Sequence, residues 1–206
     1  MIPPIWPKDL TLLFVGTVVS DLSDTIGFYH INTKDRLWEL LENSAITPNR
    51  IITKDDCKAM IDGHKFGSVS EPVRLMFIEK KTSQLLKLGI GLSDLNRRMI
   101  AANEKDKAVK PNEHDVRDFV AKAGELTPKV LAFILNPDIF VESFKRRYPD
   151  ANTTLGLQPF KIGSSEVWLL GSTTALLRGE GLTQQEDAFF TLGERVEAIK
   201  KNVGPN

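Results

Sequence analysis

Three short polar segments follow apolar runs in this chain, and their residue types could do chemistry. The polar side chains nearest the ends of those runs are Ser20, Asp21, Asn136 and Ser172. A carboxylate or a hydroxyl can hold a water molecule, and a carboxamide offers both a donor and an acceptor. In open α/β sheets, ligands bind beyond the carboxyl ends of the strands. We therefore expect one site built from Thr17–Asn32, Asn136–Asp138 and Gly171–Gly179.

The elements that would position these segments alternate between apolar runs and amphipathic stretches. Buried strands are predicted at Leu10–Gly16, Lys129–Leu135 and Val167–Leu170. Helices are predicted at Lys34–Asn43, Lys54–Ile61, from Ser70 onward, Glu113–Ala123, Ile139–Tyr148 and Gln185–Lys201. Uniformly apolar strands that alternate with helices predict an α/β fold, a three-layer α/β/α sandwich with a short, mainly parallel central sheet. The length suits one domain over residues 1–206.

Two polar stretches between these elements are interpreted as loops. They are Thr17–Asn32, which follows the first strand, and Asn96–Pro111, which is charged and irregular. Asn32 or Thr33 is the expected N-cap of the helix that follows the first loop.

Composition excludes several classes of protein. Basic and acidic side chains number 27 each, so no long-range field attracts a polyanion, and any affinity for nucleic acid must come from local clusters. The single cysteine, Cys57, excludes an internal disulfide and fits a reducing, cytoplasmic location. The three histidines are far apart in sequence, so no metal site is expected. No apolar run approaches the roughly 18 residues that span a bilayer, and no signal peptide or membrane partner is expected.

Five segments occur in the order and spacing of motifs from one enzyme family. Gly16–Ser20 stands where that family has G-I-N-P-G, and Asp35–Trp38 stands at its N-R/H-F-W. The other three are Gly89–Asn96, similar to G-I-G-F-T-N-M-V, Gly156–Ile162, similar to G-L-Q-P-H-K-I, and Gly171–Ala175, similar to P-N-P-S-G. The chain thus resembles the mismatch-specific uracil/thymine-DNA glycosylases of the uracil-DNA glycosylase superfamily.

This resemblance implies a DNA repair hydrolase that flips uracil or another damaged pyrimidine out of DNA and leaves an abasic site. No cofactor is expected, and the protein is expected to be a monomer. The three loops offer no persuasive lysine for a Schiff base, so a monofunctional enzyme is expected. Its partner would be DNA containing uracil or abasic sites. One departure concerns catalysis: the asparagine that positions the attacking water in the family is replaced by Val18, which can neither donate nor accept a hydrogen bond. Ser20, Asp21 and Ser172 are the candidates for holding water or stabilising the sugar cation.

The remaining candidate residues would bind the base. Gly16, Thr17 and Val18 belong to the first motif, and Asn136 offers a carboxamide to the pyrimidine edge. Phe28 and His30 lie where the family places a ring that stacks on the extruded base. Each has a structural alternative: Asn136 before proline is a good N-cap, Ser20 and Asp21 are common in caps and turns, and Phe28 can anchor its loop on the core.

The segment after the last apolar run would contact DNA. Two leucines would enter the duplex as a wedge, an arginine would contact a phosphate or the opposite strand, and small hydroxylic residues would bond phosphates. These residues are Thr173, Thr174, Ala175, Leu176, Leu177 and Arg178. A catalytically silent module that binds abasic or mismatched DNA is the alternative. A nucleotide-binding protein or a serine hydrolase is disfavoured, since no phosphate-binding glycine loop and no GxSxG is present.

Overall fold

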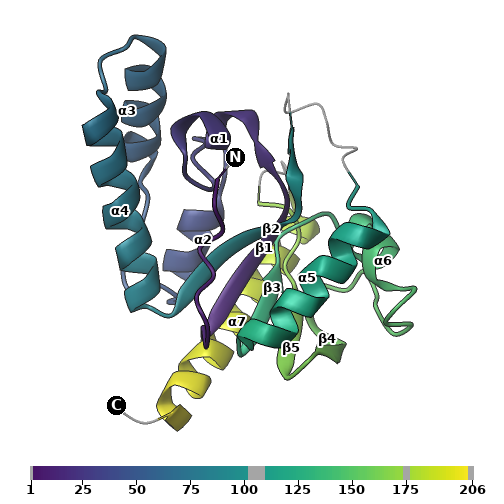
Figure 1. Ribbon diagram of the computed structural model, residues 1–206. Helices are drawn as coiled ribbons and strands as arrows, with labels where there is room; N and C mark the ends of the chain where they lie inside the picture. The colour runs from purple at the N-terminus through teal and green to yellow at the C-terminus, as the bar shows by residue number, and fades with distance from the viewer. Residues whose placement is uncertain (1, 102–109, 174–176, 204–206) are drawn as a thin grey trace.

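The computed structural model describes residues 2–101, 110–173 and 177–203, which form a sheet covered by helices on both faces (Figure 1). The strands are β1 (Leu12–Ser20), β2 (Ile90–Ala101), β3 (Val130–Phe133), β4 (Gly156–Ile162) and β5 (Ser165–Leu169). Their order is β2-β1-β3-β5-β4, and β4 alone of these five strands runs antiparallel to its neighbour. The predicted three-layer α/β/α sandwich with a mainly parallel sheet is confirmed.

Seven helices cover the sheet in the described part of the chain. They are α1 (Asp21–Ile26), α2 (Leu37–Asn43), α3 (Lys54–Lys65), α4 (Glu71–Lys87), α5 (Glu113–Leu126), α6 (Pro137–Phe144) and α7 (Glu180–Val203). The core divides into two clusters, one beneath α5 and α6 and the other beneath α1, α2, α4 and α7. Helices α3 and α4 lie side by side at one flank (Figure 1). No helix among these residues is both long and apolar enough to cross a membrane.

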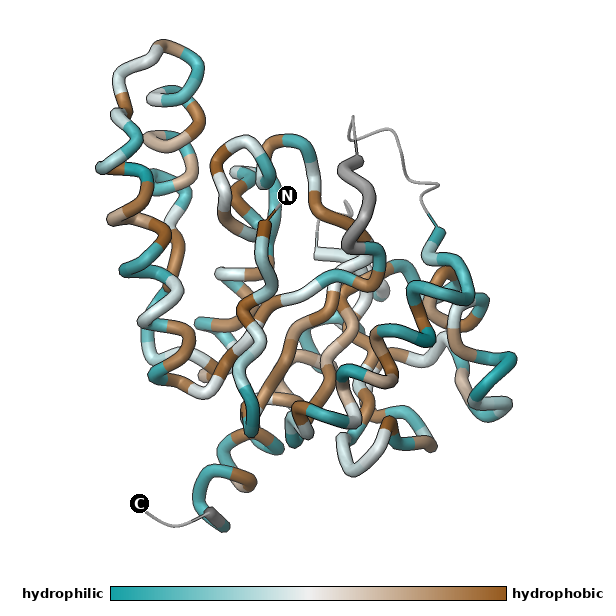
Figure 2. The backbone as a smooth tube through the Cα atoms, viewed as in Figure 1, coloured by the Kyte–Doolittle hydropathy of each residue, from teal (hydrophilic) through white to brown (hydrophobic). Residues whose placement is uncertain are grey.

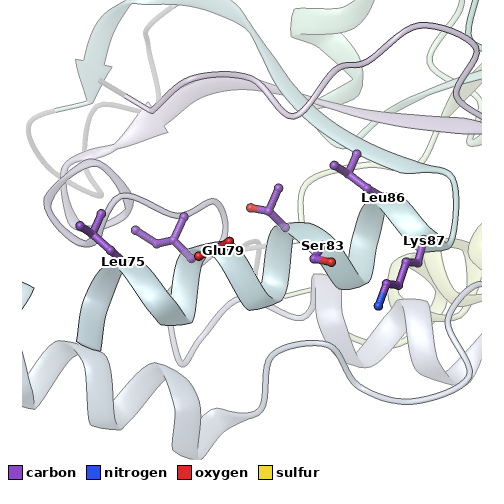
Figure 3. Close-up of a pocket in the computed structure, with 7 residues that line it drawn as sticks. Leu75, Glu79, Ser83, Leu86 and Lys87 are labelled. Atoms are coloured by element: carbon purple, nitrogen blue, oxygen red, sulfur yellow. The ribbon is translucent and has the colours of Figure 1, made fainter. Parts of the chain in front are cut away.

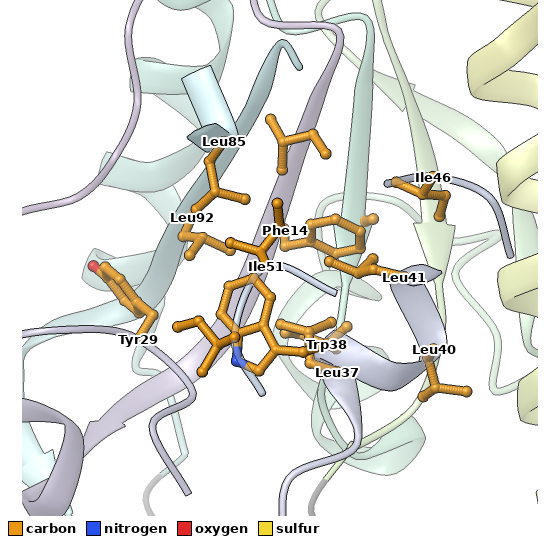
Figure 4. Close-up of a cluster of buried hydrophobic side chains, with 14 of the residues drawn as sticks. Phe14, Tyr29, Leu37, Trp38, Leu40, Leu41, Ile46, Ile51, Leu85 and Leu92 are labelled. Carbon is orange, nitrogen blue, oxygen red and sulfur yellow. The ribbon is translucent and has the colours of Figure 1, made fainter. Parts of the chain in front are cut away.

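Alternation along the central strands explains why both faces are covered. All four residues of β3 are buried; Leu131 and Phe133 pack toward α5 and α6, whereas Val130 and Ala132 pack toward the opposite layer. In that opposite layer, Phe14 of β1 lies among leucines and Trp38 of α2 (Figure 4). The apolar strands form the brown centre of the molecule in Figure 2. A sheet buried on both faces requires continuous apolar strands, which is the pattern that the sequence shows.

Both predicted loops are partly wrong. β1 continues to Ser20, because β-branched Thr17, Val18 and Val19 extend its pairing with β2, and α1 then follows directly. β2 continues to Ala101 despite its charged composition, because its backbone pairs with this extension of β1 across a register shift after Val18. β2 is an outer strand, where backbone pairing tolerates polar side chains, and it was not predicted as a strand; β1 was predicted, but too short.

The helix predicted at Lys34–Asn43 corresponds to α2, and its predicted start is also wrong. The helix begins at Leu37 with Arg36 as its N-cap, without a side-chain cap from that residue. Asn32 instead accepts a hydrogen bond from the Lys34 backbone, at 3.0 Å. Asp35 provides a hydrogen-bond acceptor for the first turn of α2, because its Oδ1 accepts from the backbone N–H of Leu37 at 2.9 Å. A turn at Thr33 and Lys34, closed by a hydrogen bond from the Asp35 backbone to the Asn32 carbonyl at 3.0 Å, therefore precedes α2 in place of its predicted first residues.

Candidate functional site

The three predicted site segments do lie at one edge of the sheet. β1, β3 and β5 are parallel neighbours, so the segments that follow them emerge together, with Asn136 between the other two. The backbone of Arg36 donates to the Thr173 carbonyl at 3.1 Å, which joins the segment after β1 to the segment after β5. Gln185 of α7 is buried and its Nε2 donates to the carbonyls of Leu170 and Ser172, which fixes the start of the last segment.

A buried ion pair lies at this edge, in the segment that follows β1. His30 Nδ1 and Asp35 Oδ2 are 2.6 Å apart, and the Asp35 side chain is only 2% exposed. The Thr173 side chain bonds to the same carboxylate. Trp38 Nε1 donates to the His30 carbonyl at 3.0 Å and holds His30 in a left-handed conformation, with φ of 53°. Asp35 thus links the histidine, the start of α2 and the segment after β5.

The two pKa shifts favour the ionised pair between pH 3.8 and pH 6.5. Burial lowers the pKa of His30, but the Asp35 carboxylate, helped by the more distant Asp94, raises it above the ordinary value of 6.5. Burial raises the pKa of Asp35, but the His30 charge and hydrogen bonds from Leu37 and Thr173 bring it below the ordinary 3.8. Below pH 6.5 the raised pKa favours an imidazolium at the carboxyl edge of the sheet.

Two buried polar residues of β2 lie beside the first motif, and neither was predicted as a site residue. Asp94 is paired with Gly16 and Asn96 with Val18, and each of these β2 residues is 3% exposed. Paired residues of parallel strands point to the same face, so both side chains lie on the face that carries α1 and α2. The available signal was two polar residues two positions apart in a strand that begins with apolar residues.

Gly16 is a glycine because Asp94 lies against it. A Cβ built on Gly16 would be 2.2 Å from Asp94 Oδ1, closer than van der Waals contact allows. We expect Gly16→Ala to displace the carboxylate and lower the free energy of unfolding by about 1–3 kcal/mol, as overpacking does. The matched control is Gly124→Ala in α5, where a Cβ meets nothing within 4 Å. That change should stabilise the protein by about 0.5–1 kcal/mol. Urea unfolding of both variants measures the difference, and equal stability of the two would contradict this account.

The two predicted catalytic residues of the first segment, Ser20 and Asp21, form the start of helix α1. Ser20 is the N-cap, and its Oγ accepts from the Ser23 backbone at 3.2 Å. Asp21 is exposed in the first turn of this helix, where a carboxylate stabilises the helix dipole. Ser172 is half-buried at the same edge of the sheet. The capping role is therefore realised for Ser20, and Asp21 faces solvent.

Asn136 combines both of its predicted features. Its Oδ1 accepts from the backbone of Asp138 at 2.8 Å and from that of Ile139 at 3.4 Å, so it is the N-cap of α6. Pro137 occupies the first helical position. The side chain is nevertheless exposed, and the cap uses only its oxygen. The amide nitrogen therefore does not contribute to the cap.

The other predicted contacts divide into buried and exposed positions. Phe28 is 1% exposed and packs against the rings of Trp38 and Phe77, so it anchors its loop on the core. Thr17, Val18 and Leu177 are half-buried, Thr173 is buried and Arg178 is exposed. Thr174, Ala175 and Leu176 lie outside the described residues. Of the two predicted stacking rings, His30 is the one at the edge of the sheet.

One groove lies away from these residues, and a small cavity borders Asp35. An open groove of about 760 Å³ runs along α4 between Leu75 and Lys87 (Figure 3). A cavity of about 10 Å³, no larger than one water, lies between Asp35, Trp38 and Cys57. Burial raises the pKa of the Cys57 thiol to about 11, so it is protonated at neutral pH and is a poor nucleophile.

No protein-family model matches this chain, and no curated protein matches it.

Proposed function

We propose that this protein is a DNA glycosylase that hydrolyses the N-glycosidic bond of uracil in DNA by base flipping and leaves an abasic site. The observation that carries the proposal is the hydrogen bond from the Arg36 backbone to Thr173, with the buried His30–Asp35 pair beside it. The hydrogen bond joins the segment of His30 and Asp35 to Thr173, and the strand order places the exposed Asn136 between them at the same edge of the sheet. Three of the five glycosylase-like motifs, Gly16–Ser20, Asp35–Trp38 and Gly171–Ala175, belong to the end of β1 and to the two segments that this hydrogen bond joins.

The chemistry of this edge suits departure of a base anion. Cleavage sends the electron pair of the glycosidic bond to N1 of uracil, so a nearby positive charge and a fixed amide donor stabilise the transition state. Asp35 occupies Nδ1 of His30 and favours the imidazolium, which leaves Nε2 to meet the base. Asn136 Nδ2 provides a neutral donor at the end of the neighbouring strand. Arg178 is exposed beyond the segment and suits a phosphate.

Turnover on uracil-containing DNA tests the proposal. The protein is incubated with a labelled duplex that carries one uracil, and abasic sites are then cleaved with alkali. We expect product in molar excess over enzyme, and none from the same duplex with thymine in place of uracil. Binding of the uracil duplex without strand cleavage would contradict the enzyme and support the silent DNA-binding module instead.

A further inference from the structure

Hydrolysis at this edge needs a polar group that holds the attacking water, and the end of β1 does not supply one. Val18 is apolar, the Ser20 hydroxyl caps α1, and Asp21 faces solvent. The neighbouring strand, β2, does carry polar side chains here: its residues paired with Gly16 and Val18 are Asp94 and Asn96.

The geometry of the strand pair brings these two side chains together. Residues two positions apart on a strand point to the same face, with Cα atoms about 7 Å apart. One water that makes hydrogen bonds of about 2.8 Å to each of two side chains spans such a separation. Asp94 Oδ1 lies over Gly16, and Asn96 is beside Val18, one step nearer the carboxyl end. Both belong to the layer of His30, whose charge interacts with Asp94.

We propose that Asn96 and Asp94 hold and activate the attacking water of the glycosylase reaction. The Asn96 carboxamide orients the water, and the Asp94 carboxylate accepts one of its protons. The water oxygen bonds to C1′ of the deoxyribose as the bond from C1′ to N1 of uracil breaks, and the electron pair of that bond goes to the base. The uracil anion takes a proton from solvent, and Asp94 returns its proton to solvent. This assignment rests on the proposed glycosylase function.

Moving the carboxamide across the strand pair tests the assignment. We expect Asn96→Val to lower kcat on the uracil duplex by about 100-fold or more, the scale of losing an oriented catalytic group. The double variant Asn96→Val with Val18→Asn returns a carboxamide to the adjacent paired position. It should recover kcat to within about tenfold of the wild type, since a displaced group loses part of its effect. The control, Asn96→Val with Val18→Leu, should recover nothing.

A second variant keeps the test decisive if Asn96→Val fails to fold, as urea unfolding would show. Asp94→Asn is nearly isosteric, and we expect it to lower kcat by about 100-fold and to flatten the acid limb of the pH–rate profile. If the wild type is active and either folded variant has the same kcat as the wild type, the assignment of the water site is overturned and the glycosylase proposal still stands. Wild type without turnover would overturn the glycosylase proposal itself, and the assignment with it.

Discussion

Asn136→Asp is expected to lower kcat/KM on uracil-containing DNA by about 1000-fold while leaving the fold intact. Loss of one preorganised donor to a developing anion costs about 100- to 1000-fold, and a carboxylate at the same place also repels the departing base. Stability should change by less than about 1 kcal/mol, because aspartate is an equally good N-cap and keeps the oxygen that the backbones of Asp138 and Ile139 need. Initial rates on the uracil duplex, together with urea unfolding, separate the two effects.

A matched asparagine provides the control. Asn152 Oδ1 also accepts a backbone hydrogen bond, from Thr154 at 3.0 Å, and its Nδ2 donates to the Asp150 carbonyl at 3.2 Å, but it lies before β4 and outside the three site segments. Asn152→Asp should leave kcat/KM within about twofold and stability within about 1 kcal/mol. If Asn136→Asp keeps full activity on the uracil duplex, the residue is only a helix cap and the base is recognised elsewhere.

Asp35→Asn is expected to cause the largest loss of stability, about 3 kcal/mol near pH 5.5, because it leaves the protonated His30 without its buried partner. Asparagine keeps an oxygen for the Leu37 backbone, so the start of α2 is preserved and the loss reports the ion pair. Urea unfolding at constant ionic strength measures the difference from wild type. Asp187→Asn, on the exposed side of α7, should change stability by less than about 0.5 kcal/mol.

The pH dependence of that loss follows from the two pKa shifts. His30 has a raised pKa, so its contribution is complete below 6.5 and is lost as pH rises through the higher folded value. Asp35 has a lowered pKa, so its contribution is complete above 3.8 and is lost as pH falls through the lower folded value. The difference between wild type and Asp35→Asn should therefore be largest between 3.8 and 6.5 and much smaller near pH 9. A difference that stays constant from about pH 5.5 to about pH 9 would contradict an ionised pair.

Several features of the fold could be predicted from local sequence. The apolar run around Val130–Phe133 required a strand covered on both faces, and Asn136 followed by Pro137 marked the start of a helix. Parallel strands place their following segments at one edge, so the neighbourhood of Asn136 and Ser172 was also predictable. Each of these predictions depends on residues close together in the chain or on a general rule of sheet topology.

The sequence by itself thus determined the layers of the sandwich and the edge at which a site would form. Only the tertiary structure decided which side chains meet there. Asp94 and Asn96 lie beside Gly16 and Val18 because the strand register aligns them, and the Asp35 carboxylate bonds to the side chain of Thr173, far along the chain. Register and burial depend on how the whole core packs, whereas hydropathy and capping depend on a few neighbouring residues, so the charged centre of this site could not be predicted from its local sequence.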